Sequence, residues 1–213
     1  MAFLDASTSR VAVIVLNYNG LADTLKCLES LQHLEGDPCR IVLVDNASEV
    51  DPRIQAERVL PALESIRTER NLGYAGGNNR GMEYAIEHGA EFLLVLNNDT
   101  VVAPALVTTL LAAFDRDPSL GILGPVVNAM EQPEHIMTYA AAFNRGPATE
   151  FFERVFVPLD VDPPVVAPVD IVNGCCMMIR AAVVRRVGMF DEDLFIVHEE
   201  SDLCLRAGRA GFR

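Results

Sequence analysis

Two amide side chains and one carboxylate, Asn97, Asn98 and Asp99, directly follow an apolar run at residues 92–96. Strand alternation would place Asn97 and Asp99 on the same side of the chain. Carboxylate and amide oxygens in this arrangement suit Mg²⁺ or Mn²⁺, with substrate phosphates completing the coordination shell. Alternatively, Asp99 caps the helix entered near Pro104 or stabilises a turn. This motif alone leaves both interpretations open.

A second acidic group lies near the end of the sequence, in HEESDLC at residues 198–204. Acids in the first turn of a helix interact favourably with its dipole, and Asp202 stands four residues before Arg206, the spacing of a helical ion pair. This accounts for Asp202 but leaves Glu199 and Glu200, beside His198, as candidates for a general base. We expect His198 itself to be packed or hydrogen-bonded rather than a ligand.

The stretch NLGYAGGNNRG, at residues 71–81, holds four glycines and three asparagines. It is neither a Walker A loop, because no Gly-Lys-Ser/Thr follows, nor a GxGxxG motif. Close approach of the backbone to a ligand, or a helix start facing a phosphate, would require such glycines. A tight loop leading into a helix explains them equally well. Asp45, in DNAS, also has two possible roles: it could accept hydrogen bonds from a base or sugar, or it could form an Asx-turn.

Strands and helices alternate over the first ~125 residues, and this order determines where these groups would meet. Buried strands are predicted at residues 11–17, within 40–48 ahead of a turn, and within 91–100, with a short strand at 64–69 and a further one at 121–127. Helices are predicted at 21–34, from Pro52 onward, at 74–88 and at 104–115. The pattern predicts an α/β fold with a mostly parallel sheet and helices on both faces. Ligands of such sheets bind beyond the carboxyl ends of the strands, where Asn17, Asp45 and Asp99 would lie together.

The remaining sequence is less regular. Residues 128–168 contain six prolines and weak periodicity, and we interpret them as a loop or irregular hairpin that covers the site. Residues 169–180 are strand-like on both sides of Asn173 and Gly174. Helices are expected at 181–187 and 199–210. All 213 residues are interpreted as a single domain.

Composition excludes several classes of protein. The net charge of −13 argues against a nucleic-acid partner. No apolar stretch approaches the length of a membrane span, and the first residues lack a secretory signal. The five cysteines, at positions 27, 39, 175, 176 and 204, include no CxxC pair, so we expect buried free thiols and a cytoplasmic location.

Six segments taken together resemble family 2 glycosyltransferases, particularly the rhamnosyltransferase-like branch. In order they are VAVIVLNYNG, IVLVDNAS, NLGYAGGNNRG, LLVLNNDT, VNGCCMMIR and GMFDEDLFIVHEESDLCLRAGRAGFR. The resemblance implies a GT-A (Rossmann-like) fold and an inverting sugar transfer from a nucleotide diphosphate donor. It implies donor contacts by Asn17, Asn19, Asp45, Asn71, Gly76, Asn79 and Asn98.

The resemblance also implies roles for the acidic groups. NND stands for the family's DxD, which makes Asp99 and Asn97 the metal-binding pair for Mg²⁺ or Mn²⁺, with an amide in place of the first carboxylate. Glu199 and Glu200 align with the family's Glu-Asp pair. Glu200 is then expected to deprotonate the acceptor hydroxyl, with Glu199 as the alternative base.

The expected partners follow from the same resemblance. They are a dTDP- or UDP-linked sugar, with rhamnose as the first candidate, and a saccharide or lipid-linked acceptor in surface polysaccharide synthesis. Through that acceptor we expect peripheral association with a membrane. Residues 1–127 are assigned to the nucleotide-sugar half and 169–213 to the acceptor and catalytic half, which ends earlier than in relatives.

Two competing interpretations remain. A nucleotide-sugar-binding domain without turnover is favoured by the early end of the chain and opposed by the presence of Glu200. A sugar-1-phosphate nucleotidyltransferase ranks last. Such an enzyme should have a glycine-rich, basic loop after the first strand, and the sequence NYNGLAD found there is neither glycine-rich nor basic.

Overall fold

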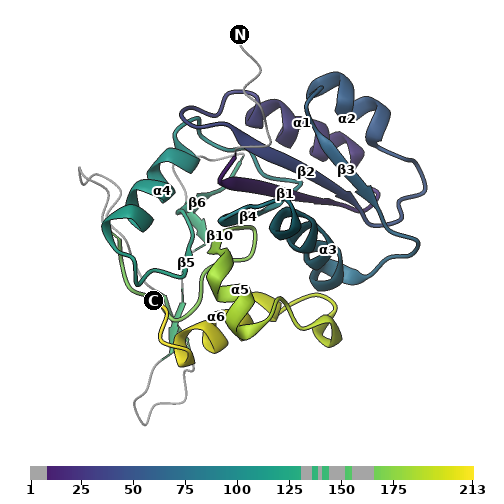
Figure 1. Ribbon diagram of the computed structural model, residues 1–213. Coiled ribbons are helices and arrows are strands. Elements are labelled where there is room, and N and C mark those ends of the chain that lie inside the picture. The colour runs from purple at the N-terminus through teal and green to yellow at the C-terminus, as the bar shows by residue number, and fades with distance from the viewer. Residues whose placement is uncertain (1–8, 131–135, 139–140, 144–151, 155–165) are drawn as a thin grey trace.

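A six-stranded sheet forms the centre of the computed structural model, which describes residues 9–130, 136–138, 141–143, 152–154 and 166–213 (Figure 1). The strand order is β3-β2-β1-β4-β10-β5. Its strands are β1 (Val11–Asn17), β2 (Cys39–Asp45), β3 (Glu64–Arg67), β4 (Phe92–Asn97), β5 (Ile122–Leu123) and β10 (Cys176–Arg180). The first four pair in parallel, whereas β10 is antiparallel to both β4 and β5. The prediction of a mostly parallel sheet is confirmed.

Helices cover both faces of this sheet, as predicted (Figure 1). The helices are α1 (Leu21–Leu31), α2 (Arg53–Val59), α3 (Gly73–Glu87), α4 (Leu106–Arg116), α5 (Ala181–Val187) and α6 (Glu199–Arg209). Alternate side chains of β1 enter two separate cores: Val13 and Val15 pack with α1, α2 and α4, while Ala12 and Ile14 pack with α3, α5 and α6. Strands buried on both faces explain why their sequences are continuously apolar.

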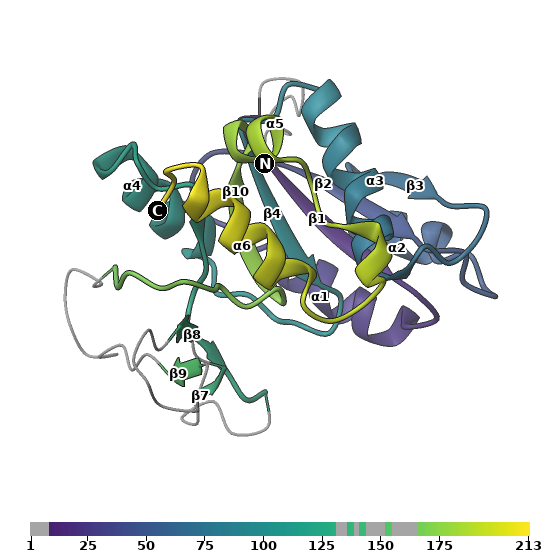
Figure 2. The same cartoon turned by 90° about the horizontal axis from the view of Figure 1, so that it is seen from below.

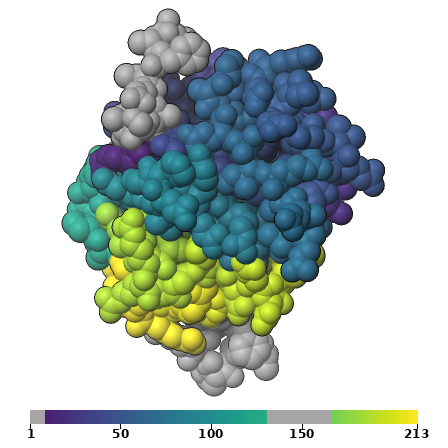
Figure 3. All heavy atoms as spheres, turned by 45° about the vertical axis from the view of Figure 1, so that its right-hand side comes forward, coloured from purple at the N-terminus to yellow at the C-terminus, as the bar shows by residue number. Residues whose placement is uncertain are grey.

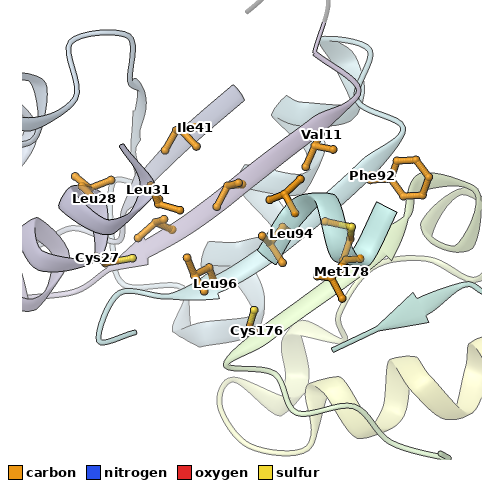
Figure 4. Packing of buried hydrophobic residues seen from close by; sticks show 14 of the residues in the cluster. Val11, Cys27, Leu28, Leu31, Ile41, Phe92, Leu94, Leu96, Cys176 and Met178 are labelled. Carbon is orange, nitrogen blue, oxygen red and sulfur yellow. The ribbon is translucent and has the colours of Figure 1, made fainter. Parts of the chain in front are cut away.

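The first of these cores lies between the sheet and helices α1, α2 and α4, and Figure 4 shows part of it. Cys27, Leu28 and Leu31 of α1 pack with Leu96 of β4 and Met178 of β10. Each fully buried leucine contributes roughly 1.5–3 kcal/mol through removal of its surface from water. All five cysteines are free thiols; three are buried, and those at 39 and 175 are half-buried.

Two glycines of helix α3 allow it to pack directly on the sheet. A Cβ on Gly77 would lie 2.5 Å from Cδ1 of Leu16, and one on Gly81 would lie 2.4 Å from Cγ2 of Ile14. These glycines therefore serve the packing of helix on sheet. Gly73, with φ of +74°, begins the helix in a conformation that L side chains rarely adopt.

Two predicted strands differ from the structure. Residues 169–172 contain only an isolated bridge at Ile171, because β10 already has β4 on one side and β5 on the other. The single strand predicted at 121–127 is instead divided into β5 and β6 (Val127–Asn128). Pro125 lies between them and offers no N–H to a ladder.

The segment at 128–168 contributes small strands outside the main sheet. β6 pairs with β7 (Ile136–Thr138), and β8 (Ala141–Phe143) pairs with β9 (Phe152–Arg154). Figure 2 shows β7, β8 and β9 apart from the six-stranded sheet. Most of the segment lies outside the described residues, so its role as a cover remains a prediction, as does the division into two halves. None of the described helices is long and apolar enough to cross a membrane.

Gly81→Ala should lower the free energy of unfolding by about 1–3 kcal/mol, because the added methyl group would collide with Ile14 and Val44. Gly208→Ala, in α6, is the matched control: a Cβ there meets nothing within 4 Å. The control should stabilise the protein by up to about 1 kcal/mol. Urea denaturation of both variants measures the difference. Equal effects of the two substitutions would contradict the close packing of α3.

Candidate functional site

A pocket opens beyond the carboxyl ends of β1, β2 and β4, where the order of strands and helices predicted a binding site. Residues from both halves of the sequence line it: Leu16, Tyr18, Asn46, Asn71, Gly73, Tyr74, Asn97, Asn98, Asp99, Phe195 and Ile196. The lining combines asparagines and aromatic side chains with a single carboxylate, that of Asp99. The lining therefore offers polar groups for orientation and rings for stacking, the usual composition of a small-molecule site.

The carboxylate of Asp99 is exposed and has no hydrogen bond or ion pair with the described residues. Asn98 and Asp99 form a turn after β4, so strand alternation ends at Asn97; even so, all three line the pocket. The alternative role of Asp99 as a helix cap is not observed, because α4 begins after Ala105 without a side-chain cap. An unpaired carboxylate at this place is free to bind a ligand.

Asn97 adds a second oxygen. Its Oδ1 is buried and has no hydrogen-bond partner among the described residues, while its backbone N–H donates to the carbonyl of Cys175 (2.9 Å). Together with the Asp99 carboxylate, this atom fits a hard divalent cation. The described residues contain no group of three or more His, Cys, Asp or Glu side chains that could hold a metal. A cation here would therefore need oxygens from its ligand and from water.

Asn17 lies beneath the pocket, with none of its surface exposed. Its Nδ2 donates to Oδ1 of Asp45 and to Oγ of Ser48, both at 2.9 Å. Its Oδ1 accepts from the backbone N–H of Gly20 (3.2 Å) and from the hydroxyl of Thr24 (2.9 Å). The structure thus places Asn17 as a buried link between strand ends, and its predicted contact with a donor remains a prediction.

Asp45 is also buried, at 3 % exposed, and is absent from the pocket lining. Its Oδ2 lies 2.8 Å from Nη1 of Arg67, an ion pair without the alignment of a hydrogen bond. Next to it, Asn46 does line the pocket. Its Nδ2 donates to Oδ1 of Asn71 and to the carbonyl of Gly73, both at 2.9 Å. Asn46 was missed in the sequence, although it stands in the same DNAS motif.

The other predicted donor residues are divided between the pocket and its supports. Asn71 and Asn98 line the pocket, and Nδ2 of Asn98 donates to the hydroxyl of Thr24 (2.9 Å). Asn19 is exposed, with φ of 55°, and is not among the residues that line the pocket. Gly76 and Asn79 lie elsewhere, on the side of α3 that faces residues 190–192.

Asn79 fastens that segment to α3. Its Nδ2 donates to the carbonyl of Phe190 (2.9 Å), and its Oδ1 accepts from the N–H of Phe190 (3.1 Å). A Cβ on Gly76 would lie 2.8 Å from Cβ of Leu72 and 3.5 Å from Cδ of Glu192. Both residues therefore support the site from behind, and the structure does not bring them to the pocket.

Glu199 and Glu200 occupy the first turn of α6 in different surroundings. Glu199 is 4 % exposed and its Oε2 has no partner among the described residues. Burial, with the nearby charge of Glu200, raises the pKa of the Glu199 carboxyl. Glu200 is half-buried and accepts a hydrogen bond from Oγ of Ser201 (3.3 Å). The predicted ion pair between Asp202 and Arg206 is present at 2.6 Å.

Tyr74 links these carboxylates to the pocket, a role that its sequence context did not reveal. It lines the pocket, and its hydroxyl donates to the carbonyl of Gly174 (2.8 Å). Burial raises the pKa of the Tyr74 phenol well above its usual value, and the charges of Glu199 and Glu200 add to this effect. Tyr74 therefore stays neutral and can act as a hydrogen-bond donor.

A strained segment separates the pocket from α6. Phe195, Val197 and His198 all have positive φ, at 52°, 78° and 77°, although none is glycine. The N–H of Ile196 donates to the carbonyl of Leu194, which closes a γ-turn around Phe195. Such strain gathers at functional sites, where the surrounding structure enforces it. Phe195 and Ile196 line the pocket and remain about half exposed or more.

The fold and this pocket define the class of protein: an α/β protein with a pocket beyond the carboxyl ends of its parallel strands. Comparison with known sequences gives the family. The profile described as glycosyl transferase family 2 matches residues 12–188. The chain belongs to this family.

Two relatives show the same likeness over most of the chain. The N-acetylglucosaminyl-diphospho-decaprenol L-rhamnosyltransferase of Mycobacterium tuberculosis is 27% identical over 96% of this chain and 72% of its own length. The dTDP-rhamnosyl transferase of Shigella flexneri is 27% identical over 93% of this chain and 63% of its own length.

Solved structures confirm the GT-A fold. The mannosyltransferase PcManGT from Pyrobaculum calidifontis, in complex with GDP-Man and Mn²⁺, superposes with a TM-score of 0.70 at 18% identity. Staphylococcus aureus TarS 1-349 in complex with UDP superposes with a TM-score of 0.67 at 18% identity. This chain is covered to 97% and 93%, respectively, yet it spans only 55% of each of those chains.

Glu199 should make stability depend on pH. Because its pKa is raised in the folded protein, the folded state holds the proton more tightly than the unfolded state. Stability therefore falls as pH rises from the ordinary glutamate pKa through the raised one. Glu199→Gln removes this loss, so its unfolding free energy relative to wild type should increase over that range. Urea denaturation across pH measures it, with exposed Glu87→Gln as control. Parallel pH profiles for wild type and Glu199→Gln would contradict the burial of this charge.

Proposed function

We propose that this protein is an inverting glycosyltransferase that moves a sugar from a nucleotide diphosphate donor to a hydroxyl acceptor. The observation that carries the proposal is the unpaired Asp99 carboxylate on a pocket at the strand ends of a family 2 fold. The donor would occupy this pocket, with its base and ribose beside Tyr18, Asn46 and Asn71.

Asp99 and Asn97 would hold Mg²⁺ or Mn²⁺ together with the donor diphosphate. The free carboxylate and the buried, unpartnered Oδ1 of Asn97 support this assignment. When bound, the cation supplies positive charge that offsets the charge on the leaving diphosphate. A structural neighbour described with GDP-Man and Mn²⁺ has the same fold.

Glu200 would act as the general base. It is half-buried and so can be reached by an acceptor, whereas Glu199 is almost fully enclosed. Glu200 takes the proton of the acceptor hydroxyl as the hydroxyl oxygen forms a bond to the anomeric carbon. The bond from that carbon to the diphosphate oxygen breaks on the opposite side, which inverts the configuration and releases a nucleoside diphosphate.

The substrates are proposed from the relatives. Two of these are rhamnosyltransferases, one named for a dTDP donor and one for an acceptor with a decaprenol lipid. We therefore propose dTDP-rhamnose or a UDP-sugar as donor, and a saccharide or lipid-linked acceptor in surface glycan synthesis. Such an acceptor would also bring the protein to a membrane surface.

Asp99→Asn should abolish the metal-dependent part of nucleotide binding, because the amide cannot supply the anionic oxygen. Calorimetry with UDP and dTDP, each with and without Mn²⁺, measures this. Asp115→Asn, an exposed position on α4, is the control and should bind as wild type. Metal-dependent affinity that survives in Asp99→Asn would contradict the proposed cation site.

Glu200→Gln should slow release of nucleoside diphosphate from dTDP-rhamnose or a UDP-sugar by about 10²–10⁴-fold, while donor binding persists. Glu199→Gln should have a smaller effect. A larger loss in Glu199→Gln would assign the base to that residue instead. Binding without turnover in the wild type would indicate a donor-binding module, and release of pyrophosphate would indicate nucleotidyl transfer.

A further inference from the structure

Tyr74 stands where the donor pocket, the end of β4 and the start of α6 meet. It belongs to the first turn of α3, and its hydroxyl donates to the carbonyl of Gly174, one hundred residues later in the chain. Its ring packs toward Phe190, with 6.2 Å between ring centroids. The hydroxyl of Tyr74 is partly buried and finds its partner within the protein, so this hydrogen bond holds residue 174 against the start of α3.

The turn at residues 173–175 also contacts the candidate metal site. The N–H of Cys175 donates to Oδ1 of Asn173 (2.8 Å), which closes the turn. The carbonyl of Cys175 accepts from the N–H of Asn97 (2.9 Å), which joins the turn to the end of β4. The turn thus lies directly beside the residues that follow β4, including Asp99.

The same turn lies against Glu200. A Cβ placed on Gly174 would be 3.5 Å from Cβ of Glu200, 3.6 Å from its Cγ and 3.6 Å from the hydroxyl of Tyr74. A side chain at position 174 would therefore touch both residues at ordinary contact distance, so the backbone of Gly174 lies beside both Glu200 and the Tyr74 hydroxyl. A shift of the turn would change the space available to the Glu200 side chain.

The first turn of α3 also holds the segment that leads into α6. The N–H of Ala75 donates to the carbonyl of Phe195 (3.1 Å), in the strained stretch before Glu199. The surface of the C-terminal residues, green to yellow, borders that of α3 and its neighbours, blue to teal (Figure 3). Tyr74 thus holds the 173–175 turn beside α6, and Ala75 holds the segment around Phe195 that precedes α6.

We propose that Tyr74 is a positioning residue: its hydroxyl fixes the 173–175 turn and, through it, the place of Glu200 relative to the donor pocket. This inference rests on the proposed function. Tyr74 would affect the rate of the transfer step rather than donor affinity, because its hydroxyl donates its proton to the carbonyl of Gly174.

Tyr74→Phe removes the hydroxyl and retains the ring in the core. We expect kcat for nucleoside diphosphate release from dTDP-rhamnose to fall about tenfold or more, since small misplacements of catalytic groups are costly. KM for the donor, and the Kd for dTDP with Mn²⁺, should not change. Tyr84→Phe is the matched control on the same helix; Tyr84 stacks on His88 at 4.0 Å, away from the pocket, and its variant should keep wild-type kcat.

Hydrogen exchange tests the positioning without relying on turnover. Peptides covering residues 173–176 and 199–203 should exchange faster in Tyr74→Phe than in Tyr84→Phe or wild type. Unchanged exchange in these peptides, or unchanged kcat, would overturn the inference. An equal loss of donor affinity and kcat would also overturn it, because it would make Tyr74 a binding residue. A wild-type protein that releases no nucleoside diphosphate would instead overturn the proposed function, and the exchange result would still decide whether Tyr74 holds the turn.

Discussion

The buried side chain of Asn17 is the interaction on which the site depends. It is fully enclosed, so each of its polar atoms must be satisfied within the protein. Its amide nitrogen donates to Asp45, the last residue of β2, and to Ser48 beyond that strand. Its amide oxygen accepts from Thr24 in α1, and Thr24 in turn accepts from Asn98 after β4. One amide thereby connects the ends of three neighbouring strands. This network supports the residues that line the pocket. At position 17, a residue that cannot both donate and accept hydrogen bonds would leave buried polar groups unpaired.

A second set of contacts joins the two halves of the sequence. α3 carries Asn79, which binds the backbone of Phe190, and Tyr74, which binds Gly174. The glycines of α3 face the sheet or neighbouring segments, so the helix can lie close to both. The candidate cation oxygens come from β4 and the turn after it, and the candidate base comes from α6.

Much of this arrangement was predictable. Parallel strands buried on both faces need continuous apolar runs, and their polar ends must gather at one edge, so the sheet and the position of Asp99 follow from pattern alone. The roles of Asn79 and Gly76 did not follow, because a glycine- and asparagine-rich segment can serve a ligand or packing equally well. The prediction of a strand at 169–172 was also wrong. Both edges of β10 are paired with strands far away in the sequence, which local periodicity does not reveal.

The sequence by itself determined the α/β fold, the edge of the sheet where the pocket opens and the family, because these depend on local periodicity and on motifs that keep their order. Tertiary structure alone decided which polar residues face the pocket and which lie beneath it. Asn17 and Asn71 look alike in the sequence, yet one is saturated in the interior and the other lines the cavity. The physical reason is that hydrogen-bond partners such as Gly174 for Tyr74 come from segments far apart in the chain, and nothing local encodes their meeting.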